Sequence, residues 1–107
     1  MDTITLPTAV EKFIEANNAH DIDALMAVFS SGAKVADDGK TYSTTEEIRA
    51  WVASHLVAPR VVITPTSFAD GRLVASSDGD FDGGPLDFAF EFATQGDLVS
   101  ELSVDLA

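Results

Sequence analysis

Apolar residues recur at helical spacing through the first half of the chain and predict three helices. The first carries Leu6, Val10, Phe13, Ile14 and Asn17 on one face, with Pro7 in its first turn. A second helix begins at the N-cap residue Asp21 and ends at Ser30-Ser31-Gly32. Its apolar stripe consists of Ile22, Leu25, Met26 and Phe29.

A third helix begins in the segment 43–47, where two capping boxes fit, Ser43 with Glu46 and Thr44 with Glu47. Its apolar face carries Ile48, Trp51, Val52 and then either His55 or Leu56. A short strand over 33–37 separates the second helix from the third, and the turn dipeptide Asp38-Gly39 ends it.

From Arg60 onward the apolar pattern has a period of two, which predicts strands. The first covers 60–68, and Pro65 within it indicates an edge strand or a bulge. Asp70-Gly71 turns the chain into a strand over 72–77. Two further alternating segments, 86–93 and 98–106, flank a loop at 94–96.

In an antiparallel pair, two directly opposed residues have their side chains on the same face of the sheet. The alternating apolar sets of the last two strands have even numbers, so they share a face only if the numbers of opposed residues add up to an even sum. A three-residue loop, Thr94-Gln95-Gly96, meets that condition, and Gly96 suits a positive φ. One face of the resulting sheet is strongly apolar, so the helices must cover it. The order of elements therefore predicts an α+β fold, with a cavity between the twisted sheet and the helices.

Composition limits the range of functions. The 107 residues form one domain, 1–107, with 46% hydrophobic and 22% charged residues. A net charge of −12 repels phosphate backbones and anionic lipids, which argues against nucleic-acid and membrane partners. Residues 73–107 hold 8 of the 18 acids and no base. The N-terminal segment resembles no signal peptide and no apolar run reaches membrane length, so we expect a cytoplasmic protein.

The run from Thr8 to Phe29 (TAVEKFIEANNAHDIDALMAVF) resembles the opening of nuclear transport factor 2-like, SnoaL-like and ketosteroid-isomerase-like proteins. Those proteins join two helices by an Asn-x-Gly-Asp-x-Asp junction, and His20 replaces the usual glycine here. The later segment GDFDGGPL, 79–86, is similar to a small bacterial subset of the group. The resemblance implies a cone-shaped barrel, in which a curved mixed or antiparallel sheet packs on three N-terminal helices around a pocket. It also implies a homodimer, which is common in the group.

Asp37 is the main catalytic candidate. In ketosteroid-isomerase-like proteins an aspartate near the end of the first strand is the general base, and the resemblance places Asp37 at that position. Alternation puts Asp37 on the same face as Val35, toward the pocket, and turns Asp38 outward. Burial in an apolar pocket makes a carboxylate a stronger base. The alternative is that Asp37 only stabilises the polar turn Asp37-Asp38-Gly39-Lys40.

Other residues are candidates for contacts with a ligand. His55 lies near the buried face of the third helix, where it would act with Asp37 as a proton shuttle or bind a polar group of the ligand. Alternatively it is a hydrated residue that interacts with the helix C-terminus. Asn17 has a similar pair of interpretations. Among the aromatic residues, mostly expected in the core, we assign Phe13, Trp51, Phe88 and Phe90 to the ligand site.

The resemblance to the isomerases is incomplete. Their first-helix tyrosine, which donates to the developing oxyanion, corresponds to Phe13, and their second aspartate falls near Phe88, with Asp87 on the opposite face. Without those donors an enolate loses a large stabilising contribution, which argues against steroid isomerisation. A different acid–base reaction using Asp37 alone, as in cofactor-free SnoaL-type cyclases, stays open.

No cofactor or metal is predicted. Asp78-Gly79-Asp80-Phe81-Asp82-Gly83 matches the start of a calcium loop, but the twelfth position is Ala89 and the flanks are strands, so a hairpin loop is favoured. Two isolated histidines and no cysteine do not form a usual zinc site.

Three functions therefore stay open. The first is a small enzyme that uses Asp37 on an apolar carbonyl substrate. The second is a module that binds a small apolar ligand without turnover. The third is an association domain, although its outward residues Asp87, Glu91, Glu101 and Asp105 disfavour symmetric pairing unless Arg60 or Arg72 intervenes.

Overall fold

The computed structural model describes residues 5–37, 39–80 and 83–107. Three helices, α1 (Thr8–Asn18), α2 (Ile22–Val28) and α3 (Thr45–Trp51), precede most of the sheet, and α3 continues into a π-helical segment, η1 (Val52–Val57). The strands of the described ranges are β1 (Phe29–Asp37), β2 (Lys40–Tyr42), β3 (Val62–Ala69), β4 (Arg72–Asp78), β5 (Leu86–Gln95) and β6 (Leu98–Leu106).

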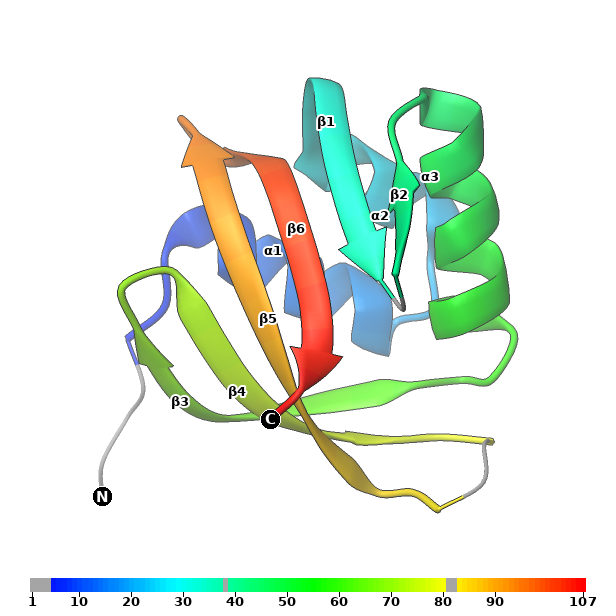
Figure 1. Cartoon of the computed structure of the whole chain (residues 1–107), viewed down its shortest axis with the longest axis vertical. Helices are drawn as coiled ribbons and strands as arrows, with labels where there is room; N and C mark the ends of the chain where they lie inside the picture. The colour runs from blue at the N-terminus through cyan, green and yellow to red at the C-terminus, as the bar shows by residue number, and fades with distance from the viewer. Residues whose placement is uncertain (1–4, 38, 81–82) are drawn as a thin grey trace.

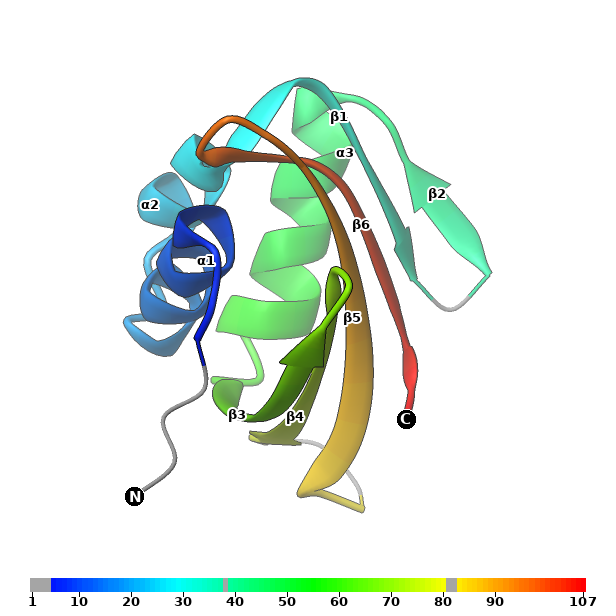
Figure 2. The same cartoon turned by 90° about the vertical axis from the view of Figure 1, so that its left-hand side faces the viewer.

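The strands form one curved sheet in the order β2-β1-β6-β5-β4-β3, and only β1 and β6 are parallel neighbours. The three helices cover its concave face (Figure 2), where α1 packs against β3 and β6, α2 against β1, and α3 against β1 and β2. In Figure 1 the labelled helices leave the opposite face of the sheet uncovered. This architecture confirms the predicted α+β cone with a mixed sheet.

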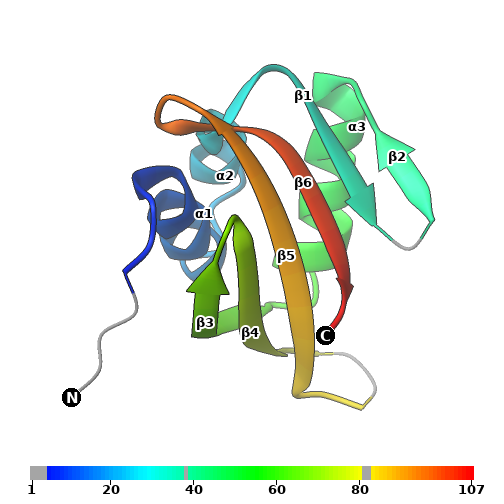
Figure 3. The ribbon, with the colours of Figure 1, turned by 60° about the vertical axis from the view of Figure 1, so that its left-hand side comes forward.

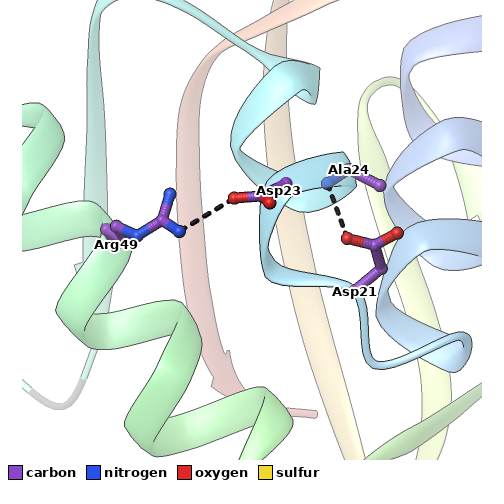
Figure 4. A network of polar contacts seen from close by, with 4 residues as sticks. All are labelled: Asp21, Asp23, Ala24 and Arg49. Carbon is purple, nitrogen blue, oxygen red and sulfur yellow. Dashed lines mark hydrogen bonds and ion pairs between the residues drawn. The ribbon is translucent and has the colours of Figure 1, made fainter.

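The junction between α1 and α2 follows the expected helix signals. His20, at the position where the resemblance implies glycine, adopts a φ of +54°. Asp21 then caps α2, since its carboxylate accepts a hydrogen bond from the backbone N–H of Ala24 at 3.1 Å (Figure 4). In the same view Asp23 of α2 pairs with Arg49 of α3 at 2.8 Å. Because both side chains are exposed, this ion pair contributes little to stability.

Of the two capping boxes predicted at the start of α3, the one formed by Thr44 and Glu47 is present. Thr44 accepts from the backbone N–H of Glu47, and the Glu47 carboxylate accepts from the backbone N–H groups of Ser43 and Thr44. Further along, Leu56 rather than His55 continues the buried face after Trp51 and Val52.

Two local predictions before α3 are wrong, as is the three-residue loop predicted at 94–96, since β5 continues to Gln95. Residues 30–32 do not end a helix, because α2 already ends at Val28 and β1 begins at Phe29. These residues belong to the irregular start of β1. The register of β1 against β6 shifts between Phe29 and Lys34, and Gly32 has a φ of +78°. The second error is the omission of the short strand β2, which pairs with the end of β1. Asp38, expected in the turn between them and facing outward, lies outside the described residues.

The two signals read from Pro65 are both confirmed. Strand β3 lies at the edge of the sheet, and its register against β4 shifts between Pro65 and Ser67. The turn that follows uses Asp70 and Gly71 at positive φ. A side chain at Gly71 would lie 2.9 Å from the carbonyl oxygen of Phe92, so this close approach requires glycine.

Strands β5 and β6 satisfy the even-sum condition by an unexpected route. Gln95 pairs with Leu98 across a two-residue turn, which gives an odd sum, and a register shift between Ala93 and Thr94 corrects it. Ser100 is the extra residue, and its hydroxyl donates to the carbonyl of Ala93 at 3.0 Å. Beyond this bulge, pairs such as Phe90 with Val104 share the inner face.

The hydrophobic core lies between the helices and the concave face of the sheet. Its largest fully buried apolar side chains are Trp51, Phe13, Leu25, Ile63, Leu73 and Leu102. No helix among the described residues is long and apolar enough to cross a membrane.

Candidate functional site

Strands β1, β4 and β6 end on the same side of the sheet (Figure 3). A pocket of about 690 Å³ opens there, lined by the sheet and by the helical segment α3–η1. This volume lies within the range of small-molecule sites, about 300–1,000 Å³. The wall is mostly apolar. The lining residues are Asp37, Trp51, Ser54, His55, Leu56, Pro59, Val61, Ser77, Phe88, Phe90, Val104, Asp105 and Leu106.

Asp37 is held in the wall by a specific hydrogen bond. It is the last residue of β1, where it pairs with Lys40 of β2 and Val104 of β6, and its side chain is half-buried. The indole Nε1–H of Trp51 donates to Asp37 Oδ2 at 2.9 Å. Within the described ranges Asp37 Oδ1 has no hydrogen-bond partner, so this oxygen is free to meet a ligand.

Trp51 also connects Asp37 to His55. The indole is 1% exposed and the His55 ring stacks on it, with centroids 6.3 Å apart and planes inclined by 23°. His55 itself is exposed, one turn along the helix. Asp37 and His55 thus lie in one pocket, the first at the N–H edge of the indole and the second on its face, and among the described residues no hydrogen bond or ion pair joins them.

The hydrogen bonds around His55 indicate its tautomer. Ser54 Oγ donates its only proton to the carbonyl of Ala50 at 2.8 Å, so it accepts at its 2.9 Å contact with His55 Nδ1. Nδ1 therefore carries a proton, and Nε2 of the neutral ring is an acceptor. This assignment leaves Nε2 able to receive a proton at the pocket.

Two of the proposed aromatic residues, Phe88 and Phe90, line the sheet side of the pocket. Phe90 is buried and Phe88 half-buried, and their ring centroids are 6.4 Å apart. They alternate with outward residues along β5, so the period-two pattern that predicted the strand also brings both rings to the same wall.

Phe13 and Asn17 lie outside the residues that line this pocket. Phe13 is fully buried behind Phe90, with ring centroids 6.2 Å apart, and belongs to the core. Asn17 is also fully buried, and its Nδ2 donates to the carbonyl of Val61 at 3.0 Å, which ties α1 to the segment before β3. The helical spacing that suggested both residues is that of a core face.

The sequence prediction missed three polar residues in the wall, the first of which is the exposed Ser54 beside His55. Ser77 continues the inward face of β4 after Leu73 and Ala75, and it is only 2% exposed. A serine at an inward position of an alternating strand was the available signal. Asp105 lies on β6 at the rim and is exposed. Its alternation with apolar residues predicted an outward position, and only the tertiary structure brings it to the pocket.

The oxyanion donors of the isomerases are not reproduced. Phe13 has no donor group, and Asp87, the residue beside Phe88, is exposed on strand β5 and does not line the pocket. Among the described residues no group of three His, Cys, Asp or Glu side chains could hold a metal ion. Part of the candidate calcium loop, residues 81–82, lies outside the described residues.

The curved sheet, the covering helices and the apolar pocket at one end define the nuclear transport factor 2-like class of α+β cone domains. Within that class the chain belongs to the SnoaL-like domain family, whose model matches residues 10–100. Comparison of the sequence with curated proteins gives no match.

Solved structures extend the likeness to nearly the whole chain. A candidate polyketide cyclase from Sinorhizobium meliloti is 26% identical, with a TM-score of 0.85 over 94% of this chain and 95% of that one. A Catenulispora acidiphila protein with a ketosteroid isomerase-like fold, in complex with trimethylamine, is 23% identical, with a TM-score of 0.78 over 96% and 88%. A Mycobacterium tuberculosis protein in complex with estradiol-17β-hemisuccinate is 18% identical, with a TM-score of 0.72 over 92% and 91%.

Proposed function

We propose that this protein is a cofactor-free acid–base enzyme that binds a small, mostly apolar carbonyl compound, with Asp37 as the general base. The observation that carries the proposal is the Asp37 carboxylate, fixed by Trp51 Nε1–H at 2.9 Å in the wall of an apolar pocket. The hydrogen bond uses Oδ2 and leaves Oδ1 to act on the substrate. A positioned carboxylate in an apolar site suits proton abstraction next to a carbonyl.

In the proposed reaction Asp37 Oδ1 removes a proton from the carbon beside the substrate carbonyl. The C–H electron pair forms a carbon–carbon double bond, and the carbonyl π electrons move to oxygen to give an enolate. Asp37, now a carboxylic acid, returns the proton to the same carbon or to a conjugated one. Alternatively, the enolate carbon attacks a second carbonyl of the same molecule, which closes a ring and moves the π electrons of that carbonyl to its oxygen. The resulting alkoxide takes the proton from Asp37, which becomes a carboxylate again.

His55 is the second group proposed to take part. Its Nδ1 is held by Ser54 Oγ at 2.9 Å, and Nε2 is the acceptor of the neutral ring. When the proton on Asp37 exchanges with solvent instead of returning to the substrate, Nε2 would receive it and release it to solvent, because the imidazole is exposed. Trp51 and the walls formed by Phe88 and Phe90 would contact the apolar body of the substrate.

The comparisons support a small molecule as the occupant. The Sinorhizobium neighbour is named as a candidate polyketide cyclase, and two more distant neighbours were solved with trimethylamine and with an estradiol ester. These names suggest cyclase or isomerase chemistry on an apolar compound as the class to test first.

The test is deuterium exchange of 2-tetralone, an apolar bicyclic ketone with acidic protons beside its carbonyl. The exchange rate in D₂O is followed by NMR, without added metal or cofactor. We expect Asp37→Asn to lower the protein-catalysed rate by at least about a hundred-fold. Asp87→Asn, which removes an exposed carboxylate that does not line the pocket, should keep the wild-type rate. If Asp105→Asn abolishes exchange and Asp37→Asn does not, the proposed base is wrong.

A second candidate, binding without turnover, is favoured by the missing oxyanion donors, since Phe13 lies in the core and Phe88 occupies the wall. In that case 2-tetralone binds to wild-type protein and to Asp37→Asn equally well, and neither accelerates exchange. Native mass spectrometry of protein purified from its own host should then show a retained small molecule. Rapid exchange dependent on Asp37 excludes this candidate.

A further inference from the structure

Ser77 carries a buried hydroxyl whose hydrogen-bonding capacity is unused by the protein. The residue lies on β4 and is 2% exposed, and its Oγ has no hydrogen-bond partner among the described residues. A hydroxyl without a partner in such a place is unfavourable, because it has lost its hydrogen bonds to water. An alanine there would avoid this loss, so a packing role alone gives no reason for the hydroxyl.

The position of Ser77 connects this hydroxyl to the pocket. Leu73, Ala75 and Ser77 alternate as buried residues along β4, and Ser77, the last of them, is a lining residue. One rotatable bond carries the hydroxyl, so it turns toward an acceptor in the pocket without any movement of the strand. Its neighbours in the sheet, Ile63 and Leu86, are apolar and offer no side-chain partner.

Ser77 and Asp37 lie on opposite sides of the pocket. Asp37 ends β1 and Ser77 lies near the end of β4, and β6 and β5 separate these two strands in the sheet. Through Val104 and Phe90, Asp37 is in register with Leu73, and Ser77 lies four residues further along β4. Three strand spacings of about 4.8 Å and four residues of about 3.3 Å correspond to roughly 19 Å along a flat sheet, and the curvature shortens the direct path. Phe88, Phe90 and Val104 of β5 and β6 provide an apolar wall between the two polar groups.

We infer that Ser77 is a specificity-determining residue that hydrogen-bonds a second oxygen of the ligand, at the end remote from the carbonyl on which Asp37 acts. The ligand class is therefore an elongated, mostly apolar carbonyl compound, such as a fused-ring ketone, with a hydroxyl or keto oxygen at its far end. The inference rests on the proposed use of the pocket, but it concerns binding and does not require Asp37 to be a base.

The experiment compares two probes, 2-tetralone and 6-hydroxy-2-tetralone, which differ by a hydroxyl at the end of the molecule opposite the ketone. Dissociation constants are measured by calorimetry for wild-type protein, Ser77→Ala and the matched control Ser76→Ala. Ser76 is the adjacent serine on the same strand, and it does not line the pocket. The melting temperature of each protein without a probe is measured as well.

We expect Ser77→Ala to weaken binding of the hydroxylated probe by about three- to ten-fold, the usual effect of one hydrogen bond, and to change the other probe by less than about two-fold. Ser76→Ala should change neither. Without a probe, Ser77→Ala should melt at or above the wild-type temperature, because it removes a buried hydroxyl that has no partner. Equal effects on both probes, no effect on either, or a lower melting temperature would each overturn the inference.

The same proteins separate this inference from the proposed function. Asp37→Asn should retain the preference for the hydroxylated probe and lose deuterium exchange. If Asp37→Asn retains exchange, the general base is wrong, and the comparison of dissociation constants still decides the role of Ser77. If Ser77→Ala keeps the preference for the hydroxylated probe while Asp37→Asn loses deuterium exchange, the role of Ser77 is wrong and the catalytic proposal stands.

Discussion

Trp51 both packs in the core and donates a hydrogen bond at the pocket. Its indole is 1% exposed and packs beside Tyr42 and His55, so it is part of the core. Its Nε1–H also donates to Asp37 Oδ2. A hydrogen bond from a rigid, buried donor fixes the orientation of the carboxylate better than a bond from a flexible surface group would.

Replacing Trp51 by phenylalanine separates the two tasks in part. Trp51→Phe keeps an aromatic ring and removes the donor. We expect the exchange rate of 2-tetralone to fall by about ten- to a hundred-fold, because the carboxylate loses its fixed orientation. The free energy of unfolding should fall by about 2–4 kcal/mol, because a smaller ring leaves a cavity and the hydrogen bond is lost.

Tyr42→Phe is the control for this prediction, since Tyr42 packs against Trp51 with ring centroids 6.3 Å apart but does not line the pocket. It should leave the exchange rate unchanged. Wild-type exchange by Trp51→Phe, measured under conditions where the variant is folded, would show that the hydrogen bond does not position the base.

Which site residues the sequence can predict depends on how local their signal is. The position of Asp37 followed from the resemblance and from its alternation with Val35 in a strand. Its hydrogen bond to Trp51, 14 residues away, was not predictable, because it depends on how α3 packs against β1. Phe13 and Asn17 were misleading for a related reason: helical periodicity identifies a buried face but does not distinguish core from cavity.

At the scale of elements, the end of α1 acts as a cover for the edge strand β3. Asn18 Nδ2 donates to the carbonyl of Ile63 at 3.0 Å, and Ile63 N–H donates to Asn18 Oδ1 at 2.8 Å. One side-chain amide thus makes the two hydrogen bonds that a neighbouring strand would make. This pairing occupies part of an edge that would otherwise be free to associate.

Asn18→Ala should lower the free energy of unfolding by about 1–3 kcal/mol, because both Ile63 groups lose their partner. Chemical denaturation measures this loss, and amide hydrogen exchange should show reduced protection at Ile63. Asn18→Asp keeps an acceptor for Ile63 N–H but not the donor, so protection at Ile63 should persist while stability falls less. Unchanged protection in Asn18→Ala would contradict the covering role.

The start of α3 gives a prediction with a defined pH dependence. The hydrogen bond from the backbone N–H of Ser43 is the main cause that lowers the pKa of Glu47 below its ordinary value of 4.5, and the hydrogen bond to Thr44 adds to it. A lowered pKa means that the ionised form is stabilised in the folded state. The contribution is therefore complete above about pH 4.5 and is lost as the pH falls through the lowered pKa.

Glu47→Gln provides the comparison, because glutamine retains the capping geometry and does not ionise. The stability of the wild type relative to Glu47→Gln should be constant between pH 7 and about pH 5 and decrease below about pH 4.5. Urea unfolding at a series of pH values measures the difference. A difference that increases on acidification would mean that the ionised carboxylate does not stabilise the helix start.

Alternation predicted β4, β5 and β6 well because each has one face in the core and one in solvent. Alternation failed where a strand has no buried face or where its apolar residues also fit a helical pattern. Strand β2 is three residues long with no buried side chain, and Phe29 continues the helical stripe of α2 although it begins β1. The even-sum rule gave the correct register for β5 and β6 but not the bulge at Ser100 that produces it, because the rule constrains the inner face and not the turn.

At the scale of the whole molecule, most of the acidity lies away from the pocket, and Asp37 and Asp105 are the acidic residues that line it among the described residues. Asp87, Glu91 and Glu101 are exposed, as expected for a solvated outer surface. Arg72 lies opposite Glu91 in the sheet, and Lys34 lies opposite Glu101. These pairings offset only part of a net charge of −12. The homodimer that the resemblance implies stays a prediction, and sedimentation velocity at micromolar concentration tests it.

The excess negative charge predicts how stability responds to salt. Repulsion among like charges acts against the compact state, and added salt screens it, with a screening length of about 10 Å at 0.1 M and about 3 Å at 1 M. The melting temperature at pH 7 should therefore rise between low salt and about 0.5 M NaCl, by several degrees for a domain of this size. Near pH 4.1, the isoelectric point from the sequence, the same change in salt should have little effect. A melting temperature that falls with NaCl at pH 7 would mean that attractive pairs such as Arg72 with Glu91 outweigh the repulsion, and that the outer face is held together by its charges.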